Sequence, residues 1–283
     1  MLSVALAALS GLIWGVGDFS GGKATQRAAV LPVVWISKLV SLPLLVIYLV
    51  ATYVPITAVG LAWGGLAGVA GVVGLVLFYR ALAAGAMTVV APVTGVTSAA
   101  IPVVVGLVAG ERPSFTRLLG VGCALLAIAL VSIAPHPARQ RQVVTRRLVI
   151  AALGAGTGFA LFFVLLAVAG KVAGGAVGLW PIAGSQISAL VILALLLLMT
   201  RPGPWPRHAT LRWTMVAGPC DMTANALYLL ATRGGDLSVV APIAALYPVT
   251  TVILALIIEH ERLRGIQVAG LILAVAALVL VSR

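Results

Sequence analysis

Long apolar runs, separated by short polar or Pro- and Gly-rich breaks, follow one another along the whole chain. Each run is close to the ~20 residues that an α-helix needs to cross roughly 30 Å of hydrocarbon. About ten runs can be counted, and they cover Leu2 to Gly22, Val30 to Ala51, Ala58 to Ala84, Met87 to Ala109, Ser114 to Ile133, Leu148 to Ala169, Val177 to Met199, Thr210 to Thr232, Leu237 to Ile258 and Gly265 to Ser282. The pattern predicts an all-α, polytopic membrane protein with about ten transmembrane helices.

The composition strengthens this prediction. Hydrophobic residues make up 62% of the chain and charged residues 8%, whereas roughly a quarter of a soluble domain is charged. The remaining loops are too short for a soluble domain, so function must lie among the helices. The net charge of +12 is dispersed over loop ends, so we expect membrane lipid rather than nucleic acid as the neighbour. The first run lacks a basic region ahead of it and a cleavage site, so we expect a retained helix.

The sequence repeats itself at an offset of 150 positions. The matched segments pair Leu61, Trp63 and Gly68 with Leu211, Trp213 and Gly218, Val89 to Pro92 with Val239 to Pro242, Glu111-Arg112 with Glu261-Arg262, and Val131-Ser132 with Val281-Ser282. Trp, Pro, Gly and a Glu-Arg pair at one common offset are poorly explained by chance. We therefore predict two five-helix repeats, residues 1–134 and 148–283, joined by a basic linker at 135–147. Because five is odd, the second unit enters the membrane from the opposite side, which predicts an inverted repeat.

These matched segments also carry a family resemblance. They run from Ile101-Pro102 through Gly110-Glu111-Arg112 to Gly120, and from Tyr247-Pro248 through Glu261-Arg262-Leu263 to Gln267 and Gly270, with a Trp14-Gly15 pair in the first helix. Over nearly the whole chain they resemble the EamA-like family of the drug/metabolite transporter superfamily. The resemblance implies a secondary transporter of a small organic metabolite or drug, but relatives carry such varied solutes that it selects no substrate. Lys38 departs from the family, in which we expect Arg, and Glu259-His260 replaces the Ala109-Gly110 of the first copy.

Ionisable residues deep inside predicted helices are the first candidates for a binding or coupling site, because an isolated charge there costs several kcal/mol. Asp221 is the deepest carboxylate, and Asn225 and Tyr228 follow it on the same helical face. Lys38 lies about eight residues into the second helix and needs an anionic partner, for which Asp18 and Asp221 are the two choices. An unpaired acid would suit proton transfer. The alternative for the Asp221 stripe is a set of hydrogen bonds between helices.

Four further side chains complete the predicted cavity, and four prolines are candidate hinges. Asp18 lies near the end of its helix, where an interfacial role is the alternative, and Gln186 takes the place of Lys38 in the second copy, where an interhelical hydrogen bond is the alternative. Trp14 and Tyr247 could stack on a planar or cationic substrate. The candidate hinges, for which a static kink is the alternative, are Pro92, Pro102, Pro242 and Pro248.

Other functions are disfavoured by what the sequence lacks. No metalloprotease or serine-hydrolase motif and no P-loop is present, so we expect neither an enzyme nor an ATP-driven pump, and neither a cofactor nor a metal site. The expected partners are membrane lipid, a small-molecule substrate and protons, and a homodimer stays open. A non-transporting membrane scaffold is the alternative function. The expected location is a bacterial inner membrane. Basic residues on the loops after odd-numbered helices favour an orientation with both termini outside the cell, which is opposite to the family's usual orientation.

Overall fold

The computed structural model describes residues 1–83, 87–133, 145–172, 176–201, 203–260 and 264–283. Within these ranges the chain folds into helices and contains no strand. The helices are α1 (Leu2–Thr25), α2 (Val30–Val40), α3 (Leu42–Thr52), α4 (Ala58–Ala83), α5 (Met87–Val108), α6 (Phe115–Val131), α7 (Arg146–Lys171), α8 (Trp180–Met199), α9 (His208–Gly234), α10 (Leu237–Ala244), α11 (Tyr247–Ile258) and α12 (Gly265–Val281). Helices are the expected solution for a chain in lipid, because they satisfy every backbone polar group internally.

Seven segments of the described chain are long and apolar enough to cross a membrane. Two of them contain a break, because α2 and α3 together form one span and α10 and α11 together form another. The helices α6 and α12 are apolar but have 17 residues each, and α9 has 27 residues with a more polar composition. The multi-pass, all-helical class is therefore as predicted, while a count of ten spans stays a prediction.

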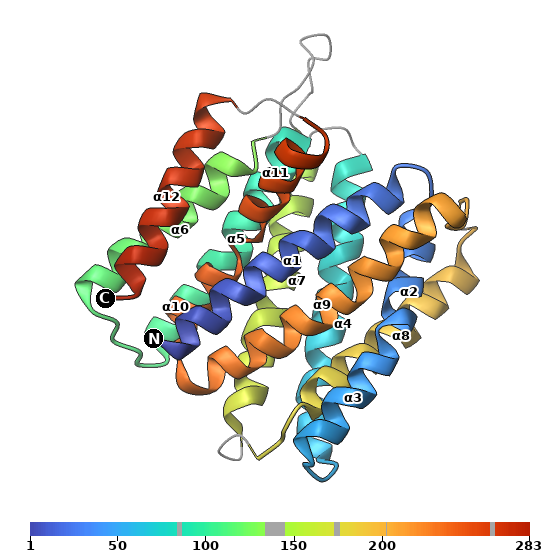
Figure 1. Ribbon diagram of the computed structural model, residues 1–283, viewed down its shortest axis with the longest axis horizontal. Helices are drawn as coiled ribbons and strands as arrows, with labels where there is room; N and C mark the ends of the chain where they lie inside the picture. The colour runs from blue at the N-terminus through green and yellow to red at the C-terminus, as the bar shows by residue number, and fades with distance from the viewer. Residues whose placement is uncertain (84–86, 134–144, 173–175, 202, 261–263) are drawn as a thin grey trace.

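The two halves of the chain interleave rather than forming separate bundles. Helix α1 packs most extensively against α9 of the second half, and α7 packs most extensively against α4 of the first half. Helix α1 also contacts α10 and α11, as α7 contacts α5, and α6 lies beside α12 (Figure 1). The contact of α1 with α9 thus corresponds to that of α7 with α4, and the contacts of α1 with α10 and α11 correspond to that of α7 with α5. Such correspondence is expected for a duplicated chain with an approximate two-fold axis.

Contacts between helix ends define two opposite faces of the protein. On the Glu111 face, the start of α1 at Ser3 meets the end of α9 at Gly234, and Lys171 at the end of α7 meets Glu111. On the opposite Lys23 face, Lys23 at the end of α1 pairs with Glu259 after α11. Helices α1 and α7 therefore run in opposite directions, which is the arrangement that an inverted repeat requires.

Two of the spans break near prolines. Helix α2 ends at Val40, Ser41 follows, and α3 begins at Leu42 with Pro43 in its first turn. This break was not predicted from the sequence, although Pro43 was a usable signal. The second break, at Ala245 and Leu246, comes just before Pro248, which lies in the first turn of α11. Of the other candidate hinges, Pro242 lies inside α10, and Pro92 and Pro102 lie inside α5, which continues through both.

Candidate functional site

An ion pair joins two helices at mid-depth. Lys38 Nζ of α2 lies 2.5 Å from Asp221 Oδ2 of α9. Asp221 lies thirteen residues from each end of α9, at the middle of that helix. The side chains are 20% and 36% exposed. Because charged groups at this depth face water-filled cavities rather than lipid, we expect water to reach both. Of the two acids that the sequence offered to Lys38, Asp221 is the one that pairs with it, which removes much of the penalty of two isolated charges at this depth.

Close backbone packing holds the two charged helices at this distance. A Cβ on Gly218 of α9 would collide with the carbonyl group of Ser37, the neighbour of Lys38. The first half contains the equivalent contact, because a Cβ on Gly68 of α4 would collide with the backbone of Ser185, the neighbour of Gln186. Small residues permit such approaches in membrane bundles. The two contacts place Gln186 and Lys38 at corresponding positions of the two halves.

Gln186 stabilises the break in the second span. Its Nε2 donates to the Lys38 carbonyl oxygen at 2.6 Å and to Ser41 Oγ at 2.7 Å. Ser41 Oγ in turn donates to the Lys38 carbonyl oxygen at 2.8 Å. Carbonyl groups at a helix end lack partners within the helix, and these side chains supply them. Gln186 therefore fixes the backbone that carries Lys38, through hydrogen bonds between helices.

Asp18 lies close to this ion pair on α1. Its neighbour Gly17 packs against α9, because a Cβ there would lie 3.2 Å from Cys220 Cβ and 3.6 Å from the Asp221 backbone nitrogen. The Asp18 side chain is exposed and lies within electrostatic range of Asp221 and of the phenols of Tyr79 and Tyr247. Helix α1 extends to Thr25, three residues beyond the predicted end at Gly22, because the glycines there do not terminate it. Asp18 consequently lies seven residues, or roughly 10 Å, inside the helix end and is deeper than predicted.

Five side chains from five helices thus form what we name the polar cluster: Asp18, Lys38, Tyr79, Asp221 and Tyr247. Its three groups that can carry a full charge are two carboxylates and one amine. Sequence reasoning missed Tyr79, since its partner is distant in the chain and a tyrosine near a helix end more often belongs to an interfacial belt.

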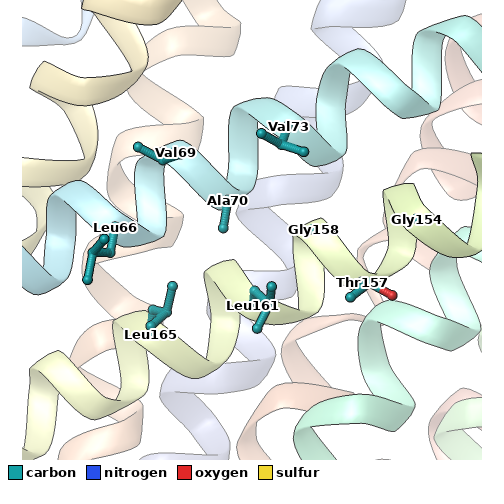
Figure 2. A pocket seen from close by; sticks show the side chains of 9 residues that line it. All are labelled: Leu66, Val69, Ala70, Val73, Gly154, Thr157, Gly158, Leu161 and Leu165. Atoms are coloured by element: carbon teal, nitrogen blue, oxygen red, sulfur yellow. The ribbon is translucent and has the colours of Figure 1, made fainter.

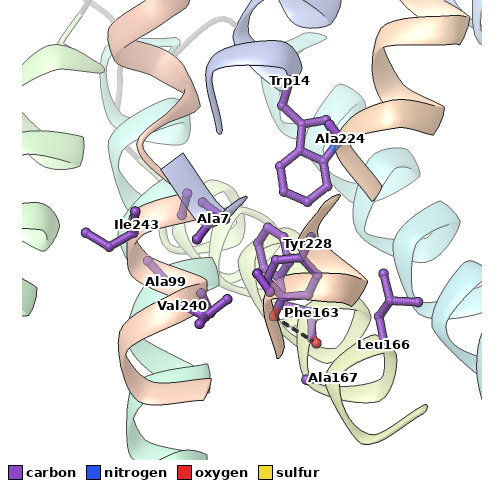
Figure 3. Packing of buried hydrophobic residues seen from close by; sticks show 14 of the residues in the cluster. Ala7, Trp14, Ala99, Phe163, Leu166, Ala167, Ala224, Tyr228, Val240 and Ile243 are labelled. Carbon is purple, nitrogen blue, oxygen red and sulfur yellow. Dashed lines mark hydrogen bonds between the residues drawn. The ribbon is translucent and has the colours of Figure 1, made fainter. Parts of the chain in front are cut away.

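The aromatic residues Trp14, Phe163 and Tyr228 form a closed layer next to the polar cluster. Figure 3 shows their rings packed together, with centroids 5.0 to 5.9 Å apart. Tyr228 is fully buried, and its hydroxyl donates to the Phe163 carbonyl oxygen at 3.1 Å. Trp14 precedes Asp18 by one turn on α1, toward the Glu111 face. Asn225 is also buried and donates to the Asp221 carbonyl oxygen at 2.6 Å.

Burial differs sharply between the two halves of the span formed by α10 and α11. All eight residues of α10, on the side of the Glu111 face, are buried, whereas no residue of α11, toward the Lys23 face, is buried. The aromatic layer and α10 therefore close the Glu111 side of the protein in this conformation. Asp18 of the polar cluster follows Trp14 on α1 and therefore lies on the Lys23 side of this layer.

Glu111 holds the closed face together. Its carboxylate accepts hydrogen bonds from the backbone N–H groups of Leu237 and Ser238, at 2.7 and 2.8 Å, at the start of α10, and Lys171 Nζ lies 3.3 Å away. Burial alone would raise the pKa of Glu111, but the two N–H donors and the Lys171 charge together lower it. Its two backbone donors are more than a hundred residues away and Lys171 is 60 residues away, so no local sequence pattern indicates this role.

An apolar groove of about 530 Å³ between α4 and α7 lies apart from the polar cluster. Figure 2 shows its lining, in which Thr157 supplies the single polar side chain. The groove contains none of the predicted site residues and no group that could orient a polar solute. Among the described residues, no three His, Cys, Asp or Glu side chains gather as a metal site would require.

Comparison with known proteins assigns the chain to a family. No curated protein matches it. A solved structure described as "Crystal structure of protein" is similar at a TM-score of 0.79 with 14% identity, over 99% of this chain and 98% of that one. At that identity the likeness shows a shared fold. The EamA-like transporter family matches twice, over residues 1–133 and 147–283. The chain, which spans the membrane several times, therefore belongs to the EamA-like transporter family of the drug/metabolite transporter superfamily.

Proposed function

We propose that the protein is a secondary transporter that moves a small organic metabolite or drug across a bacterial inner membrane by alternating access. The polar cluster is the site at which the substrate and a coupling proton, or two exchanging substrates, bind in turn. The ion pair of Lys38 and Asp221 at mid-depth, open to water and beside Asp18, is the observation that carries the proposal. Ionised groups at such depth in a membrane protein commonly mark a solute pathway.

The charges of the cluster suggest how coupling works. Lys38 neutralises Asp221 and leaves the charge of Asp18 without a formal counter-ion in the cluster. A proton, or a cationic group of the substrate, neutralises that remaining charge. A neutral cluster can be closed off from water at a lower free energy than a charged one, because burying an unpaired charge is unfavourable. Neutralisation of Asp18 by a proton or a cationic substrate therefore favours the change from the conformation open to one face to the conformation open to the other.

The packing on either side of the cluster supports alternating access. The aromatic layer, the buried α10 and the Glu111 contacts close one face, whereas no residue of α11, toward the other face, is buried. The breaks at Ser41 and at Ala245 are places where a span can bend as the closed face opens. In the proposed cycle the present conformation receives solute from the Lys23 face.

Solute-driven proton movement in reconstituted vesicles tests the proposal across several classes of substrate. Vesicles that contain the protein and a trapped pH-sensitive dye are exposed in turn to amino acids, nucleosides, sugars and cationic drugs. A coupled transporter changes the internal pH with at least one class. For exchange, vesicles preloaded with each compound take up its radiolabelled form instead.

Two variants connect any signal to the site. Asp221→Asn should abolish the solute-driven signal, because it removes the charge that holds Lys38. Asp236→Asn is the matched control, since Asp236 lies between α9 and α10 and its side chain makes no capping hydrogen bond. Absence of flux and of exchange with every class would favour the non-transporting scaffold. Equal signals from both variants would remove Asp221 from the mechanism.

A further inference from the structure

A second pocket, distinct from the apolar groove, lies on the Lys23 face, away from the polar cluster. It has a volume of about 340 Å³ and lies between the α1–α2 turn and the loop from α8 to α9. Its lining consists of Arg27, Pro204, Trp205, Arg207, Ala209 and Thr210. Two arginines, one tryptophan and one threonine hydroxyl therefore meet in one concave site that the transport proposal leaves unused.

The pocket walls are held by specific contacts. The backbone N–H of Ala29 donates to the Pro204 carbonyl oxygen at 2.7 Å, which joins the two loops. The indole ring of Trp205 packs edge-on against that of Trp35, with centroids 6.4 Å apart. Thr210 Oγ1 accepts a hydrogen bond from the backbone N–H of Arg207 at 2.9 Å. Both the tryptophan and the Arg207 backbone are therefore positioned by the fold.

The charge of the pocket is uncompensated within the described chain. Arg27 and Arg207 are exposed, and neither takes part in an ion pair among the described residues. Glu259, an acid on the same face, is already paired with Lys23. Arg201 and Arg212 are exposed on the flanking segments and add to the positive potential. An anion that accepts hydrogen bonds from two guanidinium groups fits this arrangement, and a phosphate does so well.

The position of the pocket indicates the source of the phosphate. It lies where α8 ends and α9 begins, at the level at which helices leave the hydrocarbon. Trp205 is 47% exposed there, and tryptophan is enriched at the interface between hydrocarbon and headgroups. Basic pockets between membrane helices at the cytoplasmic surface bind anionic headgroups. The count of basic residues favours the Lys23 face as the cytoplasmic one, although the family's usual orientation is the opposite.

We propose that this pocket binds the headgroup phosphate of an anionic phospholipid. Arg27 and Arg207 pair with the phosphate oxygens, and the indole of Trp205 packs beside the ester region of the lipid. The bound lipid joins the α1–α2 turn to the start of α9. It thereby supports the starts of α2 and α9, the two helices that carry Lys38 and Asp221.

Short-chain lipids added to the purified protein in neutral detergent test this proposal. Dioctanoyl phosphatidylglycerol should raise the melting temperature in a saturable way, because a ligand of the folded state stabilises it. Dioctanoyl phosphatidylcholine should give little change. Replacing both arginines with Gln should weaken the phosphatidylglycerol affinity by about thirtyfold, from ~1 kcal/mol for each basic residue.

The matched control removes the same charge elsewhere on the protein. Arg146 and Arg147 are exposed at the start of α7 and do not line the pocket. Their double replacement by Gln should leave the affinity within about twofold of wild type. Equal affinity losses in the two double variants, or equal responses to the two lipids, would overturn the site. Competition by inorganic phosphate at equal concentration would overturn the lipid as its occupant. Melting temperatures without lipid verify that all variants fold.

Discussion

Replacing Lys38 with Met leaves the carboxylate of Asp221 in mid-helix without its ammonium partner. At 2.5 Å separation the pair attracts by roughly 7 kcal/mol at an effective dielectric constant of about 20. Water reaches both side chains, and Asp221 is 36% exposed, so screening and the desolvation of both groups offset most of this attraction. We expect a net coupling of about 2 kcal/mol, within the range of groups in direct contact.

A double-mutant cycle measures this coupling. The free energy of unfolding is determined in mixed detergent micelles for wild type, Lys38→Met, Asp221→Asn and the variant that combines both substitutions. Each single variant should lose about 2 to 4 kcal/mol, because it leaves one charge unpaired. The double variant should be more stable than the sum of the single losses predicts. Additivity within about 0.5 kcal/mol would refute a direct ion pair.

Three further predictions concern packing and the closed face. Glu111→Gln should destabilise the protein by about 1 to 2 kcal/mol at neutral pH, since it weakens the hydrogen bonds to the start of α10. Because folding lowers the pKa of Glu111 below 4.5, its contribution to the free energy of unfolding is complete above that pH and is lost as the pH falls through the folded pKa. Melting temperatures measured over a pH series should therefore fall with this step for wild type and without it for Glu111→Gln. Parallel melting curves for the two proteins would contradict the prediction. Gly64→Ala should destabilise the protein by more than about 1 kcal/mol, because the added Cβ would collide with the Pro181 backbone. Gly65→Ala on the same helix has open space around the added Cβ and should be neutral or stabilising. Equal thermal stabilities of the two variants would contradict this packing. Tyr228→Phe should lose about 1 kcal/mol with the hydrogen bond to Phe163, and an unchanged unfolding free energy would show that this bond adds nothing to the closed layer.

The apolar pattern was sufficient to predict the helical membrane class, because a span must be long and uniformly apolar. The duplication was equally accessible, since Trp63, Gly68 and the Glu111-Arg112 pair recur at one offset. Depth counting also selected Lys38 and Asp221 as unusual charges. It could not choose between Asp18 and Asp221 as the partner of Lys38, because that choice depends on how α1, α2 and α9 pack against one another.

Other parts of the site depend on contacts that leave no local signal. The role of Glu111 arises from the start of α10, more than a hundred residues away. Asn225 and Tyr228 share a helical face with Asp221, but in this conformation both are buried on the closed side while Asp221 is open to water. Helical periodicity gives the direction of a side chain, whereas its access to water depends on the neighbouring helices and on the conformational state.

A disulfide across the closed face tests alternating access most directly. A Cβ on Gly234 would lie 3.3 Å from Ser3 Oγ, which suits a disulfide between Cys residues at these two positions. In a background with Ser at Cys123 and Cys220, the Ser3→Cys, Gly234→Cys variant is oxidised in vesicles and its solute transport is recorded before and after reduction. Alternating access predicts that transport is lost on oxidation and restored by reductant. Equal transport by the oxidised and reduced forms would contradict it.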